Sequence, residues 1–263
     1  MGRDRLTEKY EKMLSEIFGV ELRKMNAWQA WTYLIDAMAI GLSNALDPNK
    51  MRWEKREKEF YECTSHLEKD AAANMLAVVA LALEENPAQD FLGNMFMALE
   101  LGSRWHGQFF TPYHLAAAMA DTGIDEKQVK DTIEQQGFTS VTDYACGAGA
   151  TLIGAVEALK KQGIDYQNSV CFTANDIDRT TAQMCFIQLS LLGCAGYVTV
   201  ADGLSHPVEG DVLFPREEGQ EFWYTPMWWS DTWKTRRAVE RARHGRQGIS
   251  GHTRHDDMPI HSD

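Results

Sequence analysis

The sequence lacks several features that would place it in a specialised class of protein. No apolar run approaches the ~20 residues that a membrane-spanning helix needs, and the charged start Met1-Gly-Arg-Asp-Arg5 is not followed by the apolar core of a signal peptide. The five cysteines contain no Cys-x-x-Cys pair, which indicates reduced side chains rather than a disulfide framework. We therefore expect a cytoplasmic protein with no membrane partner.

Positive charge is also scarce. The chain carries 26 Lys and Arg against 38 Asp and Glu, a net charge of −12. From Lys234 to Asp263 there are seven basic and four acidic residues, so this segment is +3 and the rest is −15. Lys and Arg contacts to phosphates supply most non-specific DNA affinity. DNA binding would thus depend on the Arg-rich segment Lys234–Arg246 or on a separate specificity subunit. Alternatively, that segment is a solvated helix.

A glycine turn is present, but the third glycine of the dinucleotide-binding fingerprint is missing. The sequence Asp143-Tyr-Ala-Cys-Gly-Ala-Gly149, here named the Gly loop, lies between an apolar run, Phe138–Val141, and a helix-like segment, Thr151–Leu159. Gly147 and Gly149 let a ligand lie against the main chain. The Asp143 carboxylate repels a pyrophosphate and suits an ammonium group, which favours S-adenosylmethionine over NAD or ATP.

Two further strand patterns follow the Gly loop, and both end in acidic residues. They are Cys171–Asp178 and Gly196–Asp202. Ligands of open α/β sheets bind at the carboxyl ends of the strands, so three strands that end in carboxylates predict a binding site there. The alternative is that Asp176, Asp178 and Asp202 are helix caps or turn residues.

Three segments together resemble a known family. Gln89–Phe96, Gly107–Ala116 and the Gly loop are similar to the N-6 adenine DNA methylases, and among these to the modification subunits of type I restriction systems. That family has a phrase G-x-[FY]-[FY]-T-P before its glycine loop, which here reads Gly107-Gln-Phe-Phe-Thr-Pro112. The likeness covers about residues 88–204. It implies a Rossmann-like, S-adenosylmethionine-dependent methyltransferase sheet and methyl transfer to adenine N6 in DNA.

The resemblance also implies roles for individual residues. Beside the methionine end of the cofactor it places Phe110, Thr111 and Pro112. The residues that form the cofactor loop are Asp143, Cys146, Gly147 and Gly149. Asp176 would hold the ribose hydroxyls, Ile177 would pack on the adenine, and Asp202 would face the adenine's exocyclic amine. The family transfers the methyl group directly, so no metal is expected.

The chain departs from the family at the catalytic loop. The family has Asn or Asp, then Pro-Pro and an aromatic residue, to accept hydrogen bonds from the target amine and to stack on a flipped base. The nearest candidate here is Tyr224-Thr-Pro-Met-Trp228, which makes Thr225, Pro226 and Trp228 the predicted catalytic residues. Alternatively, the aromatic residues around this loop form a hydrophobic patch or a partner surface.

Length and periodicity predict the organisation of the chain. Apolar residues at helical spacing predict helices over Leu6–Phe18, Asn26–Ala45, Lys50–Glu85 and Ala88–Leu101. We expect a helical N-terminal domain (1–105), a truncated methyltransferase-like α/β domain (106–233), and an Arg-rich segment with a disordered tail, 248–263, in residues 234–263. The later strands of the family's sheet are not recognisable, so either the N-terminal helices cover a sheet edge or another chain completes the sheet.

Two functions from different classes stay open. One is an S-adenosylmethionine-dependent adenine-N6 DNA methyltransferase. The other is a cofactor-binding protein that has lost catalysis and acts as a sensor, scaffold or regulatory subunit. The partners left open by the sequence are DNA, a specificity or other protein subunit, and a second copy of the chain.

Overall fold

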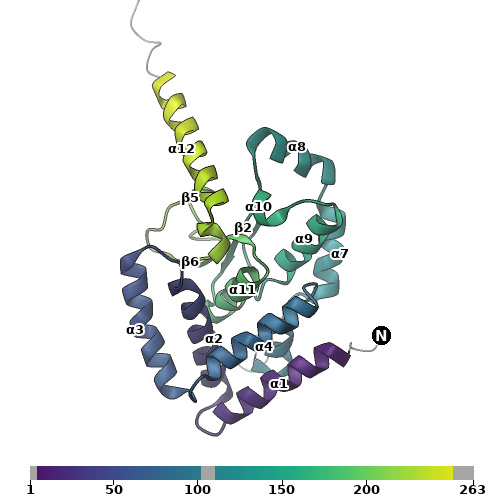
Figure 1. Ribbon diagram of the computed structural model, residues 1–263, viewed down its shortest axis with the longest axis vertical. Coiled ribbons are helices and arrows are strands. Elements are labelled where there is room, and N and C mark those ends of the chain that lie inside the picture. Colours follow the sequence, from purple (N-terminus) through teal and green to yellow (C-terminus); the bar gives the residue numbers. More distant parts are fainter. Residues whose placement is uncertain (1–4, 102–109, 251–263) are drawn as a thin grey trace, which may run out of the picture.

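The computed structural model describes residues 5–101 and 110–250 and shows a small sheet surrounded by helices (Figure 1). In this mixed α/β fold, a helical N-terminal region precedes a mostly parallel sheet, as the sequence predicted. No helix in the described part of the chain is both long and apolar enough to cross a membrane. The predicted domain boundary at residues 105 and 106 lies outside the described residues, as do residues 251–263 of the predicted disordered tail. The first tail residues, 248–250, instead form the end of the last helix.

The bounds of the elements follow the chain. The N-terminal helices are α1 (Arg5–Glu21), α2 (Ala27–Asn44), α3 (Lys50–His66), α4 (Ala71–Glu85) and α5 (Phe91–Ala98). The central elements are α7 (Tyr113–Gly123), α8 (Glu126–Gln136), β1 (Thr139–Asp143), α9 (Ala150–Lys161), α10 (Tyr166–Ser169), β2 (Val170–Asp176), α11 (Arg179–Leu191) and β3 (Ala195–Val200). The last are β4 (Gly210–Asp211), β5 (Phe214–Pro215), β6 (Glu221–Tyr224), the 3-10 helix η1 (Pro226–Trp229) and α12 (Asp231–Ser250).

The N-terminal helices begin and end where local chemistry requires. Asn26 and Asn49 cap α2 and α3 by accepting backbone hydrogen bonds from the residues three positions on. The predicted single helix Lys50–Glu85 is wrong, because the chain forms two helices, α3 and α4. Asp70, directly before α4, has a φ of 62°, a left-handed conformation that cannot continue a helix.

The three strands expected from the sequence form the parallel part of one sheet. The strand order is β1-β2-β3-β6; β1, β2 and β3 are parallel, and β6 is antiparallel to β3. In this register Asp143 lies opposite Ala174, and Asp176 lies opposite Val200. The carboxyl ends of β1, β2 and β3 therefore meet at one edge of the sheet, here named the carboxyl edge.

The two faces of the sheet have different coverings. On the first face, Phe172 and Val198 join a large core with the N-terminal helices and with α9 and α11. On the second face, Cys171 and Tyr197 join a smaller, aromatic-rich core that includes Trp228 and Trp233. This second core is built from the segment after β3. The C-terminal part of the chain thus covers a face that would otherwise expose apolar side chains.

Arginines hold both edge regions of the sheet. Arg56 of α3 donates a hydrogen bond to the backbone carbonyl of Phe222 in β6 and lies 3.9 Å from the Trp223 ring centroid. Burial lowers the pKa of Arg56 to about 10. At the other edge, Arg236 of α12 donates to the carbonyl of Gly137, just before β1. An N-terminal helix thus supplies a hydrogen bond to a backbone carbonyl at the β6 edge.

The Arg-rich segment is a helix that holds the second core. Arg237 lies 4.3 Å from the Trp228 ring centroid and Arg241 lies 5.2 Å from that of Phe214. The beginning of α12 packs on the body and its end runs out past it (Figure 1). Because these guanidinium groups face aromatic rings of the protein, they contribute to packing through cation–π contacts. This arrangement differs from a fully solvated helix.

Gly196→Ala is predicted to destabilise the fold by about 1–3 kcal/mol or more, because it overpacks the sheet. Gly196 has a φ of 153°, and an added Cβ would lie 1.7 Å from the Phe172 carbonyl oxygen. Gly41→Ala is the matched control, since its Cβ would meet nothing within 4 Å on the exposed side of α2. We expect the control to raise stability by up to about 1 kcal/mol. Urea unfolding of both variants tests this, and equal stability would contradict it.

Candidate cofactor site

Backbone and carboxylate hydrogen bonds join the Gly loop to the end of β2 at the carboxyl edge. The Cys146 N–H donates to the Asn175 carbonyl over 2.9 Å, and the Gly147 N–H donates to Asp176 Oδ2 over 2.8 Å. The other Asp176 oxygen, Oδ1, accepts from the Asp178 N–H over 2.9 Å. Asp176, to which the family resemblance assigns the ribose hydroxyls, is therefore held in place beside the Gly loop.

Both glycines of the Gly loop adopt conformations that disfavour other residues. Gly147 has a φ of 53° and Gly149 has a φ of 101°. A Cβ on Gly147 would lie 3.1 Å from the Phe110 ring, and one on Gly149 would lie 3.0 Å from Cys185 Sγ. The loop thus fits tightly between the segment before α7 and helix α11, and Gly149 then starts α9.

A small cavity of about 70 Å³ lies between the Gly loop and the Phe110-Thr-Pro112 segment. Phe110 stacks on Phe96 of α5 with ring centroids 5.2 Å apart, which fixes one wall of the cavity. Thr111 also lines the cavity and is exposed, as is the neighbouring Pro112. The structure therefore brings Phe110 and Thr111 to the Gly loop. Gly107 to Phe109, the start of the family phrase, lie outside the described residues.

Asp143 organises the loop from within. Its Oδ1 accepts from the Ala145 N–H over 2.9 Å, and its Oδ2 accepts from the Thr151 hydroxyl. Both oxygens of this carboxylate thus have donors from the protein itself.

The Cys146 thiol is buried beneath the loop. A hydrogen bond with Cys185, together with burial, raises its pKa well above the usual value. It therefore stays protonated and packs as a small apolar group rather than acting as a nucleophile.

Two more predicted cofactor residues lie at the carboxyl edge with different partners. Ile177, directly after Asp176, is 72% exposed. Asp202 turns back on its own chain, and its Oδ1 accepts from the N–H groups of Leu204 and Ser205. Hydrogen bonds from Ser205 and then Leu204 lower the Asp202 pKa, so this group is ionised at neutral pH.

The sequence did not reveal a further carboxylate in this site, that of Asp90. Its side chain lines the same cavity, and the residue is only 3% exposed. Burial raises the pKa of Asp90, against the lowering effect of hydrogen bonds from Gln188 and Gly93. The available signal was its place in Gln89–Phe96, one of the three segments that carry the family resemblance.

The structure separates the predicted catalytic residues from the cofactor site. Thr225 lies opposite Gly196, at the amino end of β3, and its hydroxyl bonds to both the N–H and the carbonyl of Gly196. β3 has six residues, about 17 Å of strand at ~3.3 Å per residue, and the Gly loop lies at its other end. This arrangement departs from the sequence-based prediction. The physical reason is that β6 runs antiparallel to β3.

Trp228 is also unavailable for base stacking in this arrangement. It is 3% exposed, with Tyr224 5.3 Å away on one side and the Arg237 guanidinium 4.3 Å away on another, both measured to ring centroids. Pro226 begins η1, which turns the chain from β6 towards α12. Thr225, Pro226 and Trp228 therefore serve as packing and turn residues here, and base stacking would need the second core to open.

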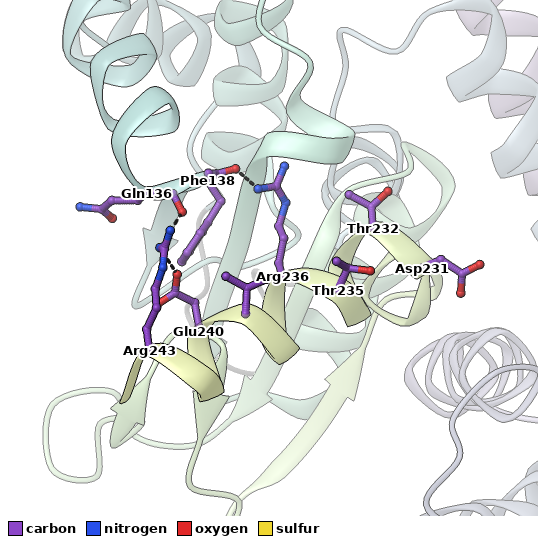
Figure 2. Close-up of a pocket in the computed structure, with 10 residues that line it drawn as sticks. Gln136, Phe138, Asp231, Thr232, Thr235, Arg236, Glu240 and Arg243 are labelled. Carbon is purple, nitrogen blue, oxygen red and sulfur yellow. Dashed lines mark hydrogen bonds and ion pairs between the residues drawn. The ribbon is translucent and has the colours of Figure 1, made fainter. Parts of the chain in front are cut away.

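A larger cavity lies away from the carboxyl edge, between α12 and the residues before β1. It measures about 520 Å³ (Figure 2). Arg236 and Arg243 reach across it from α12 to the carbonyl groups of Gly137 and Gln136, and Phe138 forms part of its wall. None of its lining residues belongs to the predicted cofactor set, so its size does not make it the cofactor site.

The N-6 DNA Methylase family model matches residues 90–258. The match begins at Asp90, includes the Gly loop and all three parallel strands, and extends over more than half of the chain. The chain belongs to the N-6 DNA methylase family. No curated protein matches this member of the family.

One similar solved structure is the type I restriction-modification system methyltransferase subunit from Streptococcus thermophilus. It is 14% identical over 78% of this chain, with a TM-score of 0.42. The match covers 60% of that subunit, so the present chain spans less than two thirds of its length. The family assignment therefore depends on the family model.

Trp228→Ala is predicted to lower the free energy of unfolding by about 3–5 kcal/mol, the usual cost of removing a buried tryptophan. Trp53→Ala is the matched control, because Trp53 on α3 is 39% exposed. We expect the control to change stability by less than about 1 kcal/mol. Chemical unfolding measures both. A stable Trp228→Ala variant would show that the second core does not depend on this ring.

Proposed function

We propose that this N-6 DNA methylase family member binds S-adenosylmethionine across the carboxyl ends of β1, β2 and β3. The observation that carries the proposal is the hydrogen bond from the Gly147 N–H to Asp176 Oδ2, which holds the Gly loop against the end of β2. An acidic residue beside a glycine turn at this edge suits a nucleoside with free ribose hydroxyls. The exposed Ile177 offers an apolar surface for its base.

The residues present fit the chemistry of this cofactor. The Gly loop and the Phe110 ring both line the cavity, and the missing Cβ atoms of Gly147 and Gly149 let the loop pack closely on Phe110 and Cys185. When bound, S-adenosylmethionine supplies a methyl group on a sulfonium. The protein's part is to hold that group in line with the acceptor and to exclude water, because positioning contributes much of the rate in such transfers.

We further propose that the acceptor is adenine N6 in DNA, the reaction of the family to which the chain belongs. The acidic body offers little attraction to phosphates. We therefore propose that DNA is bound together with a partner, either a specificity subunit or a second copy of the chain. Such a partner would also supply the hydrogen-bond acceptors that Thr225 does not offer at the carboxyl edge.

A second candidate function is cofactor binding without transfer, in a sensor or regulatory subunit. The position of Thr225 and the burial of Trp228 favour it, since both lie at the amino end of β3. The two candidates agree on the cofactor and differ only in whether a methyl group is moved.

Asp176→Ala is predicted to weaken binding of S-adenosylhomocysteine about 10- to 100-fold, because hydrogen bonds to a charged group contribute about 1.5–3 kcal/mol. Isothermal titration calorimetry measures this. Asp165→Ala is the control, because Asp165 caps α10 before the amino end of β2. The control should retain wild-type affinity. Absence of heat and of a melting shift with the wild type at millimolar ligand would overturn the cofactor proposal.

Methyl transfer separates the two candidates. Tritiated S-adenosylmethionine is incubated with unmethylated DNA and the chain, alone and with any co-purifying partner. We expect label on adenine N6, and expect it to be lost with Asp176→Ala. Label on no DNA under either condition, while S-adenosylhomocysteine still binds, would establish the second candidate.

A further inference from the structure

Asp90 is a buried carboxylate in the wall of the candidate cofactor cavity, and no salt bridge reaches it from the residues that the structure describes. Asp90 is 3% exposed and lines the cavity together with Thr111, Thr151 and the Gly loop. No Lys, Arg or His is among the described residues that line this cavity. Burying an ionised carboxylate is costly unless a cation or several hydrogen bonds offset the loss of hydration. The burial of the Asp90 carboxyl group therefore requires an explanation.

Helix capping uses only one of the two oxygens of the Asp90 carboxyl group. Asp90 Oδ1 accepts from the Gly93 N–H over 2.9 Å, as an N-cap of α5 does. An N-cap does not need to be buried, since Asp125 caps α8 in the same way on the exposed surface. Within the described residues no hydrogen bond reaches Asp90 Oδ2, so this oxygen keeps its capacity to accept.

A glutamine ties Asp90 to the Gly loop. Gln188 Nε2 donates both to Asp90 Oδ1 and to the Ala148 carbonyl, each over 2.8 Å. Gln188 Oε1 accepts from the Leu92 N–H over 3.1 Å, which fixes the orientation of the amide. All three contacts are buried. The carboxylate is thus held rigidly against the loop on which the cofactor is proposed to lie.

Asp143, which the sequence suggested for an ammonium group, differs from Asp90 in its position. Its two oxygens already accept from Ala145 and Thr151. It also lines a different cavity, of about 130 Å³, together with Thr173 and Asn175. Asp143 therefore shapes the Gly loop, and the carboxylate that lines the candidate cofactor cavity is that of Asp90.

We propose that Asp90 is the specificity-determining residue that holds the α-ammonium group of S-adenosylmethionine. The amino-acid end of the cofactor would enter the cavity between Phe110 and the Gly loop, and its ammonium group would donate to Asp90 Oδ2. This inference rests on the proposed cofactor. It adds an electrostatic selection for amino-acid-bearing nucleosides, and it explains why a charged residue is retained at a buried cap.

The test measures the affinities of Asp90→Asn and of the wild type for two ligands. One ligand is S-adenosylhomocysteine, and the other is its deamino analogue, in which hydrogen replaces the amino group. Asn is as good an N-cap as Asp, so the variant keeps the cap and removes the charge. We expect Asp90→Asn to bind S-adenosylhomocysteine about 10- to 100-fold more weakly, as loss of a charged hydrogen bond implies. Its affinity for the deamino analogue should equal that of the wild type.

Two further variants keep the result interpretable. Asp90→Ser also retains a capping oxygen and should behave like Asp90→Asn, which provides a second measurement if the first variant folds poorly. Asp143→Asn should retain the preference for S-adenosylhomocysteine over the deamino analogue. We also expect the melting temperature of Asp90→Asn without ligand to be unchanged or higher, because a buried charge has been removed.

Three outcomes would overturn the inference. Undiminished binding of S-adenosylhomocysteine by Asp90→Asn and Asp90→Ser would make Asp90 a cap only. An equal loss for both ligands would assign it a purely structural role. If only Asp143→Asn lost the preference for S-adenosylhomocysteine over the deamino analogue, Asp143 and not Asp90 would hold the ammonium group. Failure of the wild type to bind S-adenosylhomocysteine would instead overturn the proposed function, so the two failures are distinguishable.

Discussion

The candidate site depends on one contact, the hydrogen bond between the Gly147 N–H and the Asp176 carboxylate. It joins the turn after β1 to the end of β2, and the parallel register of the two strands brings these groups together. Other groups are arranged around it. The Gly147 N–H donates to Asp176, and the absence of a Cβ on Gly147 leaves room for the Phe110 ring. A ligand that takes over Asp176 with its ribose hydroxyls would also release the Gly147 N–H, so binding and loop conformation are coupled at this bond.

The direction of β6 determines how the rest of the chain is used. Because β6 is antiparallel to β3, the residues that follow it return to the amino end of the sheet and cover its second face. Arginines then hold this cover in place: Arg56 contacts Trp223 from the N-terminal helices, and Arg237 contacts Trp228 from α12. Both guanidinium groups lie over aromatic rings, and Arg56 also donates to a backbone carbonyl. Three arginines of the basic segment, Arg236, Arg237 and Arg241, thus contact the protein's own backbone or aromatic rings.

The sequence predicted the features that depend on local pattern. The strands at residues 139, 170 and 195, the Gly loop and the carboxylates at the strand ends all follow from apolar runs punctuated by Gly and Asp. It did not predict the break between α3 and α4, because the left-handed conformation of Asp70 has no strong local signal. The sequence did not predict the direction of β6 either, because a short strand of one glutamate and three aromatic residues fits either orientation equally well. Asp90 was missed because burial of a polar side chain is a property of the assembled fold.

The antiparallel direction of β6 limits where catalysis could occur in this chain. A parallel strand after β3 would have delivered the following loop to the carboxyl edge, next to the Gly loop. An antiparallel β6 delivers Thr225 to the opposite end, and its hydroxyl is already used by the Gly196 backbone. The segment that does lie at the carboxyl edge is the one that begins at Asp202, before β6. Near it, Asn175 Oδ1 is buried without a hydrogen-bond partner in the described part of the chain, beside the second cavity at this edge. Hydrogen-bond acceptors for a target amine would therefore have to come from this region or from a partner molecule, and not from the aromatic loop after β6.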